Sequence, residues 1–287
     1  MPPDTCISMW KRPIRDAMES VENQFKSQLD EAAHDITNAG YIVALAGAGL
    51  SVESGIPPYR GPGGLWTKYG EPSLLSFNEF KENPKAWWEN RLLSETENGH
   101  PIREMKLALD RAIPNPGHYS LKALEDLHLL KSTITQNVDN LQTMAGSKSA
   151  LEIHGNRTLL RCLGCGARQK RAGISFETLP PICKYCNGII KMDTVMFGEP
   201  IPKDTLKQCM DAVDNCDCML LIGTSGTVNP AAQLPMRAHK RGARLIEINP
   251  EKTPFSPICH SVFTGKSGFI LPLLVDHIRS ILRPNKT

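Results

Sequence analysis

The sequence predicts an α/β fold in which a doubly wound parallel sheet makes up most of the molecule. Short apolar runs that suit buried strands end repeatedly in small polar turns, and segments with helical spacing separate several of them. Two closely spaced pairs of cysteines interrupt this alternation and indicate a metal-binding module. We therefore expect a Rossmann-like sheet with a smaller zinc-binding module and a helical insertion.

The first elements of the chain are a helix, a strand and a glycine turn. Residues 1–17 lack periodicity and are expected to form a flexible arm. From Met18 to Ile36, apolar residues recur every three or four positions, which is typical of an amphipathic helix. Residues 41–46 are continuously apolar, as in a strand buried on both faces, and lead into Gly47-Ala-Gly49.

The middle of the chain combines a long loop with helices. Residues 55–72 are rich in Gly and Pro and too long for a simple connection, so we expect a mobile lid. Residues 76–111 have a polar, helical character and form the predicted helical insertion. A further helix follows Pro116, with one apolar stripe, and residues 132–135 then predict a strand. The stripe consists of Leu121, Leu124, Leu127 and Leu130.

Three later segments repeat the pattern of a strand followed by a polar turn. They are residues 218–222, 244–248 and 261–263, with helical patterns at 205–212 and 231–241. Ligands of open α/β sheets bind beyond the carboxyl ends of the strands, so these turns are candidates for the functional site. The predicted organisation assigns 18–75, 112–156 and 196–283 to the Rossmann-like domain, 76–111 to the helical insertion and 157–195 to the zinc-binding module.

Composition excludes several classes of protein. The chain has 287 residues, of which 40% are hydrophobic and 22% charged, so it is neither wholly disordered nor fibrous. The net charge of +3 is too small for a nucleic-acid-binding face, and we expect no direct nucleic-acid partner. No apolar run approaches the ~18–20 residues of a membrane-spanning helix, and no secretory or mitochondrial leader is evident. We expect a cytoplasmic protein, or a nuclear one if the source is eukaryotic, without membrane contact.

The cysteine spacing points to zinc. The four residues form a C-x2-C-x17-C-x2-C pattern, and paired thiolates on two tight turns can close a tetrahedral shell around Zn²⁺. Two unrelated cysteine pairs would be the alternative interpretation. A shell of four thiolates leaves no position for water, so the predicted site is structural. Its ligands would be Cys162, Cys165, Cys183 and Cys186.

The first glycine turn is a candidate nucleotide site. Glycines let backbone N–H groups approach a pyrophosphate, and Ser51 can add a hydroxyl donor. Val52 occupies the place of the third glycine of the usual dinucleotide fingerprint, so the turn alone could be an ordinary strand-to-helix connection. Asn249, directly after a predicted strand, is a candidate partner for the ribose. Gly223-Thr-Ser225 offers a second cluster of small donors.

Together these motifs resemble the signature of sirtuins, the NAD-dependent protein lysine deacylases. The resemblance begins with Gly47-Ala-Gly-Leu-Ser-Val-Glu-Ser-Gly-Ile-Pro-Pro-Tyr-Arg-Gly61 and covers about residues 30–280. The remaining motifs follow in the family's order: Gln136-Asn-Val-Asp139, His154-Gly155, the four cysteines, Phe197-Gly-Glu199, Gly223-Thr-Ser225 and Ile248-Asn-Pro250.

The resemblance implies NAD and Zn²⁺ as cofactors and acyl-lysine proteins or peptides as substrates. Tyr59 and Arg60 would close over the nicotinamide ribose, Asn137 and Asp139 would hold the nicotinamide, and the adenine would lie near Gly265. The implied cofactor-binding residues are Gly47, Ala48, Gly49, Ser51, Glu53, Tyr59, Arg60, Gln136, Asn137, Asp139, Gly223, Thr224, Ser225, Asn249, Gly265 and Lys266.

The resemblance also implies the catalytic group. A single histidine is more often structural than catalytic, but His154 matches the family's general base, and Asn137 and Asp139 would assist departure of nicotinamide. His118 is expected to be structural. An extended peptide would add as a strand between two edges that contain Val195, Phe197, Gly198, Glu199 and Val228. Phe197 could instead be a core aromatic residue.

Three other activities compete with deacylation. A mono-ADP-ribosyltransferase or an NAD glycohydrolase would use the same departure of nicotinamide with another acceptor. A catalytically inactive NAD-sensing or zinc-bearing interaction module would bind without turnover. A dehydrogenase is disfavoured because the third glycine and the strand-borne acid are absent. Departures from the family pattern, such as Pro58-Tyr59 and Asn140-Leu-Gln142, bear on the acyl chain, which the motifs leave open along with the target proteins and the oligomeric state.

Overall fold

A six-stranded parallel sheet forms the larger part of the computed structural model, which describes residues 12–283 except residue 62. The strand order is β3-β2-β1-β7-β8-β9, so successive strands run outward from β1 in one direction and from β7 in the other. This reversal creates a topological switch point between β1 and β7. The strands are β1 Ile42–Ala46, β2 Leu130–Thr135, β3 Ala150–Glu152, β7 Cys218–Ile222, β8 Arg244–Asn249 and β9 Ser261–Thr264.

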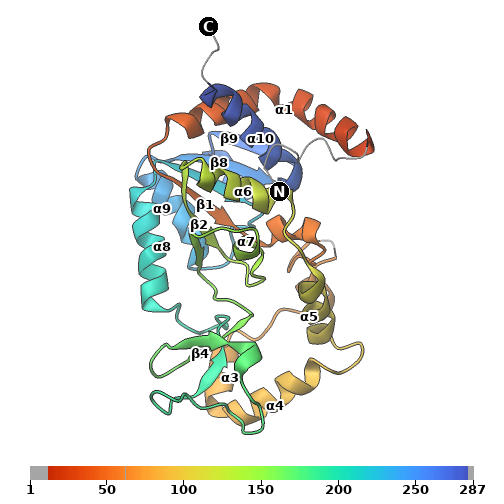
Figure 1. Ribbon diagram of the computed structural model, residues 1–287, viewed down its shortest axis with the longest axis vertical. Helices are drawn as coiled ribbons and strands as arrows, with labels where there is room; N and C mark the ends of the chain where they lie inside the picture. The colour runs from red at the N-terminus through yellow and green to blue at the C-terminus, as the bar shows by residue number, and fades with distance from the viewer. Residues whose placement is uncertain (1–11, 62, 284–287) are drawn as a thin grey trace.

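Helices cover both faces of this sheet (Figure 1). Side chains of β1 alternate between two cores: Ile42 and Ala44 pack under one layer of helices, and Val43 and Leu45 pack under the other. Every residue of β1 and β7 is buried, as the continuous apolar runs predict. The first layer is α1 Arg12–Asn38, α6 Pro116–Asp126 and α10 Ser267–Leu282, and the second is α8 Lys203–Asn215 and α9 Leu234–Lys240.

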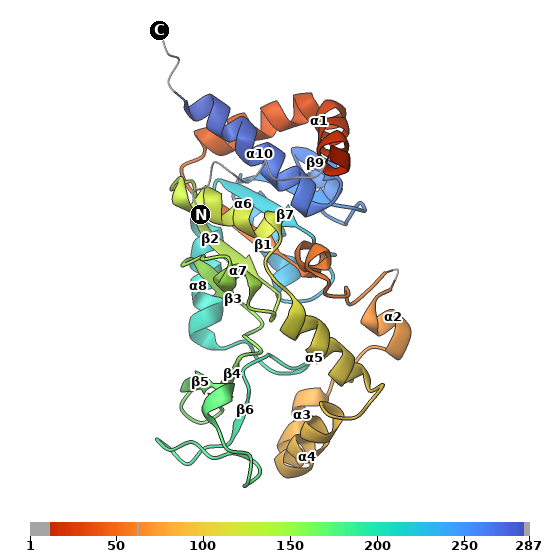
Figure 2. The same ribbon diagram turned by 45° about the vertical axis from the view of Figure 1, so that its right-hand side comes forward.

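A smaller unit lies beyond one edge of the sheet (Figure 2). It contains a three-stranded antiparallel sheet of order β5-β4-β6 and helices of the predicted insertion. Phe80 and Trp88 from these helices share one core with Leu160, Cys162 and Ile190, so the insertion and the cysteine-bearing strands pack as one body. The elements are α3 Ser76–Glu82, α4 Pro84–Ser94, β4 Leu159–Cys162, β5 Arg168–Lys170 and β6 Ile190–Met192.

Shorter elements connect the two units. α5, Pro101–Arg111, packs through Met105 and Leu109 against Ile56 and Leu141 of the sheet domain. The Gly/Pro-rich stretch contains α2 and is held to itself by backbone hydrogen bonds, such as that from Trp66 N to Tyr59 O at 2.8 Å. The other short elements are α2 Leu65–Tyr69, α7 Leu141–Met144 and the 3₁₀ helices Ala48–Ser54, Arg171–Gly173, Ala231–Gln233 and Ser256–Ile258.

The predicted α/β fold is confirmed, and two details differ. The first helix begins at Arg12, within the expected arm of residues 1–17, whereas residues 1–11 lie outside the described part. Leu130 begins β2 instead of extending the helical stripe, because α6 ends at Asp126 and His128 adopts a positive φ of 60° in the turn. The predicted domain limits stay a prediction. Within the described residues, no helix has the length and apolarity to cross a membrane.

Candidate functional site

Two glycine turns meet at the switch point of the sheet. A Cβ added to Gly47 would lie 2.7 Å from Gly223 O, and one added to Gly49 would lie 2.6 Å from Gly223 Cα. The Gly49 N–H also donates to Gly223 O at 2.9 Å. Only glycines allow this approach, which places Ala48, Thr224 and Ser225 together beyond the ends of β1 and β7. These turns are thus adjacent, as the sequence predicts.

A buried polar cluster lies beside these turns. Ser51 Oγ donates to Asp139 Oδ2 at 2.7 Å and accepts from Asn137 Nδ2 at 3.0 Å. The Leu141 N–H donates to Asp139 Oδ1 at 2.8 Å. Burial raises the pKa of Asp139, and the hydrogen bonds from Ser51 and Leu141 act against this rise. The cluster thereby holds a carboxylate and an amide side by side, which suits recognition of a carboxamide.

His118 supports this cluster from behind. The Asn115 N–H donates to His118 Nδ1 at 3.2 Å, so the ring proton lies on Nε2, which is 3.5 Å from Ser51 Oγ. Burial lowers the pKa of His118 to about 4, so the ring is neutral. The sequence predicts a structural role, and the helix cap formed with Asn115 agrees with it. The contact with Ser51 was not predicted, because it joins residues 67 positions apart.

His154 lies at the end of β3, next to the glycine turns. Its Nδ1 is 3.1 Å from Gln136 O, and a carbonyl can only accept, so Nδ1 carries the proton and Nε2 has a free lone pair. Burial lowers the pKa of His154, which keeps the imidazole neutral near pH 7. Gln136 itself donates from Nε2 to Thr224 Oγ1 at 2.8 Å. This geometry is that of an available general base.

An aromatic wall faces the site from the Gly/Pro-rich stretch. The Trp66 ring lies 5.0 Å from the Tyr59 ring and 5.7 Å from the Phe197 ring. The Arg60 guanidinium lies 4.4 Å over Trp66 and donates to Glu71 and Thr227. Burial, together with the charge of Asp139, raises the pKa of Tyr59. The sequence analysis did not include Trp66 among the site residues. Its position in a Gly/Pro-rich stretch, where a large aromatic side chain is unusual, was the signal that could have indicated it.

The predicted peptide edge runs past His154. The Val195 N–H donates to His154 O at 2.8 Å, and Phe77 N–H donates to Phe197 O at 3.0 Å. Phe197 is half-buried against Trp66, so it is a wall residue and not a core aromatic residue. Gly198 is exposed, with a φ of 80°, and Val228 is half-buried on the facing loop.

Glu199 and Glu53 have partners that the sequence analysis did not predict. The Glu199 side chain is 2% exposed and accepts from Arg161 at 2.6 Å and from Lys191 at 3.0 Å, so it is buried among basic side chains. Glu53 Oε2 accepts from Gly268 N–H at 2.7 Å and therefore caps α10 instead of facing the glycine turns. Both carboxylates have partners within the chain, and their assignment to substrate and cofactor stays a prediction.

The adenine end of the predicted site is hollow. A cavity of about 230 Å³ is lined by Gly265 and Lys266 and, from α1, by Val21, Gln24 and Phe25. Asn249 closes the neighbouring strand end, where its carbonyl accepts from Gly265 N–H at 3.2 Å. The contribution of α1 was not predicted, because its helical periodicity shows which face is buried but not what it covers.

The four cysteines converge on one point. Their Sγ atoms all lie within 4.8 Å of one another, with 3.4 Å between Cys162 and Cys186 and 3.7 Å between Cys165 and Cys183. A tetrahedral Zn²⁺ with Zn–S bonds of about 2.3 Å spaces its sulfurs by about 3.8 Å. A Cβ at Gly188 would lie 3.0 Å from Cys162 Sγ, so this turn needs glycine. The donor set therefore fits zinc.

Comparison with known proteins decides the family. The Sir2 family matches residues 47–230, which contain the glycine turns, His154 and the four cysteines. The chain belongs to the Sir2 family. It is 37% identical to the NAD-dependent protein deacylase of Thermococcus kodakarensis over 88% of this chain and 97% of that protein. It is also 37% identical to the NAD-dependent protein deacylase 1 of Archaeoglobus fulgidus, over 86% and 96%.

Solved Sir2 structures have the same fold. A Sir2 homologue in complex with ADP-ribose has a TM-score of 0.75 and 35% identity, covering 89% of this chain and 99% of that chain. A Sir2 complex with a p53 peptide and NAD⁺ has a TM-score of 0.66 and 29% identity, covering 88% and 96%. The chain therefore spans almost the whole length of these two Sir2 proteins, one of which was solved with ADP-ribose and the other with a p53 peptide and NAD⁺.

Proposed function

We propose that this Sir2-family protein is an NAD-dependent protein lysine deacylase in which His154 is the general base. The observation that carries the proposal is the state of His154: Nδ1 is held by Gln136 O, which leaves Nε2 as an acceptor, and the Gln136 side chain links this position to Thr224 in the glycine turn after β7. The relatives named above are deacylases that depend on NAD, and the activity of this chain is of the same kind.

The residues at the switch point fit NAD. The close approach of Gly47 and Gly49 to Gly223 brings the turns after β1 and β7 together where a pyrophosphate would lie, and Asn137 and Asp139 would hold the carboxamide. When bound, NAD supplies a ribose carbon that releases nicotinamide and accepts the acyl oxygen of the substrate. His154 would take a proton from a ribose hydroxyl, and Tyr59 and Trp66 would exclude water.

The substrate enters as an extended peptide between two loops. Val195 to Gly198 form one edge, and Val228 belongs to the other. Their backbone would pair with the peptide, so recognition would tolerate variation in the peptide sequence. The complex of a Sir2 relative with a p53 peptide supports this arrangement. Zinc, held by the four cysteines, would stabilise the smaller unit without taking part in the reaction.

A panel of acyl-lysine peptides with NAD, analysed by mass spectrometry, tests the proposal. Deacylated peptide and O-acyl-ADP-ribose should form in equal amounts, with nicotinamide release dependent on the acyl peptide. Nicotinamide release without acyl peptide, or a mass gain of ADP-ribose on a protein, would instead identify a glycohydrolase or an ADP-ribosyltransferase. Binding of NAD without any product would identify an inactive sensor.

We also propose that the protein acts in the cytoplasm. The eight cysteines that the structure describes form no disulfide, and the four-thiolate site suits a reducing compartment. Fractionation of cells with an antibody against the protein tests this; recovery in a secreted or envelope fraction would contradict it.

A further inference from the structure

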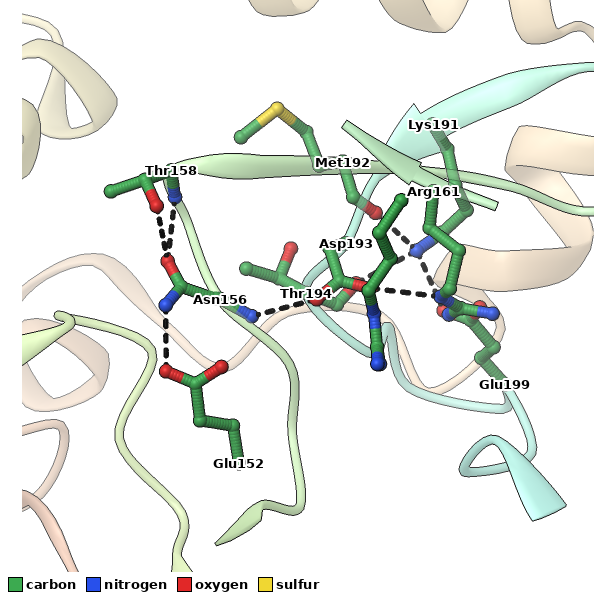
Figure 3. Close-up of polar contacts among 10 residues, drawn as sticks. Glu152, Asn156, Thr158, Arg161, Lys191, Met192, Asp193, Thr194 and Glu199 are labelled. Atoms are coloured by element: carbon green, nitrogen blue, oxygen red, sulfur yellow. Dashed lines mark hydrogen bonds and ion pairs between the residues drawn. The ribbon is translucent and has the colours of Figure 1, made fainter. Parts of the chain in front are cut away.

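Lys191 on β6 is buried without any exposed side-chain surface. Its ammonium has three hydrogens and three acceptors: Met192 O at 2.6 Å, Thr194 O at 2.8 Å and Glu199 Oε2 at 3.0 Å (Figure 3). Burial lowers the pKa of Lys191 to about 8, and the charge of Glu199 acts against this fall. A buried ammonium is costly unless it is fully paired, and this one is.

The three acceptors lie at the two ends of one loop. We define residues 193–199, which carry the predicted peptide edge, as the peptide segment. Met192 directly precedes this segment, Thr194 lies at its start and Glu199 ends it. Lys191 therefore connects the start of the peptide segment to its end.

Neighbouring groups reinforce this tie. Arg161 donates to Asp193 Oδ1 at 3.0 Å and to Glu199 Oε1 at 2.6 Å, so it also joins both ends of the peptide segment (Figure 3). Met196 N–H donates to Glu199 Oε2 at 2.9 Å, and Asn156 N–H donates to Asp193 Oδ2 at 3.1 Å. Arg168, whose side chain is 40% exposed, also donates to Asp193 Oδ1 at 2.9 Å, so three basic side chains pair with two buried carboxylates.

The middle of the peptide segment contacts the site. Val195 N–H donates to His154 O, and Phe197 O accepts from Phe77 N–H. The segment is thus held from within by charged side chains and from outside by two backbone hydrogen bonds. A buried ion pair is weak evidence for stability, since apolar side chains of similar size often stabilise a protein as well. The remaining role for the buried Lys191 ammonium is to fix the geometry of the peptide segment.

We propose that Lys191 is a positioning residue that, through Glu199, sets the backbone of the peptide segment and so places Val195 and Phe197 for substrate binding. The inference rests on the proposed deacylase function and adds to it a determinant of peptide affinity. The hydrogen bonds of Lys191 go to Met192, Thr194 and Glu199, so a change at Lys191 should affect binding of the peptide and not binding of NAD.

Substitution Lys191→Met tests the role, with two readouts. The KM for the acyl peptide should rise about tenfold or more, whereas the KM for NAD should change less than about twofold. Hydrogen exchange of the peptide segment should become faster, with β1 and β7 unchanged. The matched control is Arg171→Met, which removes a basic side chain from the same unit, where it pairs with Glu95 at 2.7 Å. The control should leave both KM values and the exchange of the peptide segment unchanged.

Further variants keep the test decisive if Lys191→Met does not fold. Glu199→Gln retains the shape of the side chain and weakens the same pairing, so it should raise the peptide KM in the same direction. Lys191→Arg retains the charge and should recover part of the peptide affinity. The double variant Lys191→Met/Glu199→Gln should raise the peptide KM by less than the product of the two single effects, because the two changes share the Lys191–Glu199 interaction, while Glu199→Gln also weakens the pairing with Arg161.

The outcomes separate this inference from the proposed function. An unmodified enzyme that does not deacylate any peptide would refute the proposed function, and hydrogen exchange would still decide whether Lys191 fixes the peptide segment. Unchanged exchange of that segment in folded Lys191→Met, or an equal rise in both KM values, would overturn the positioning role.

Discussion

Ser51 Oγ lies 2.7 Å from Asp139 Oδ2 and joins the glycine turn after β1 to the loop after β2. The serine hydroxyl has one proton, which it gives to the carboxylate, and it accepts a hydrogen bond from Asn137 Nδ2. This hydroxyl therefore joins the two predicted nicotinamide-binding residues, which are also held by Leu141 N–H on Asp139 and by Gly47 O on Asn137.

Ser51→Ala should lower kcat/KM by about 10- to 100-fold, because a hydrogen bond to a charged group contributes about 1.5–3 kcal/mol. The loss of the donor also raises the pKa of Asp139 further, since the Ser51 hydrogen bond now opposes that rise. Steady-state kinetics with varied NAD would check this. Ser51→Thr keeps the hydroxyl and should retain more activity than Ser51→Ala; equal activity of the two would contradict the role of the hydrogen bond.

His154→Ala should lower kcat for deacylation by about 100-fold or more, the usual contribution of a general base. The free energy of unfolding should change by about 1 kcal/mol or less, because the ring makes one recorded hydrogen bond, to Gln136 O. Binding of NAD, measured by calorimetry, should persist. His34→Ala, on the exposed face of α1, is the control and should keep full activity. Full turnover by His154→Ala would remove it from the mechanism.

The pH dependence of the reaction should reflect the lowered pKa of His154. The base must be neutral to take a proton, so activity is lost as the pH falls through this pKa. Because burial lowers the pKa from its ordinary value of 6.5, kcat/KM should reach half its plateau below pH 6.5. A pH–rate profile between pH 5 and 8 tests this. A midpoint above 6.5 would mean that another group, or a charged neighbour, controls the reaction.

Protonation of His118 should lower the stability of the folded protein at acid pH. Its pKa is about 4 in the folded protein and about 6.5 when unfolded, so the unfolded state binds a proton first as the pH falls. Stability is therefore lost between pH 6.5 and 4, by about 3 kcal/mol in all from this group. Urea unfolding of the protein and of His118→Asn, in which Oδ1 can replace the Nδ1 acceptor, would measure the difference. An identical loss in both proteins would refute this assignment.

Much of the fold could be predicted because its signals are local. Residues 218–222 are apolar without interruption, and they form the buried strand β7 over the same range. The polar turns after the strands were predicted to meet because parallel strands end at one edge, and Gly49 and Gly223 do meet there. The zinc ligands were predicted because the two turns bring each pair of cysteines together within a few residues.

The side-chain contacts that sequence analysis did not predict depend on distant partners. Glu53 caps a helix 215 positions away, and no local pattern relates it to Gly268. Glu199 stands within a recognised motif, but its burial depends on Arg161 and Lys191 from two other strands. The resemblance to the family places these residues near the site. The direction of each side chain depends on its tertiary partner, which is a helix N-terminus for Glu53 and two basic side chains for Glu199.

Removal of one zinc ligand should disturb more than the metal. Cys162 and Cys183 belong to the core that also contains Phe80 and Trp88, and Trp88 Nε1 donates to Ile190 O at 3.0 Å. Cys165→Ser should therefore lose the zinc, as measured by elemental mass spectrometry, and should unfold at a lower temperature. Hydrogen exchange should become faster in α4 as well as in β4.

Cys259→Ser, outside the cluster, should keep the metal and the exchange pattern. Because the sheet domain has its own two cores, exchange in β1 and β7 should stay slow in Cys165→Ser. A zinc-free variant with full stability and activity would show that the thiolates do not hold this unit together.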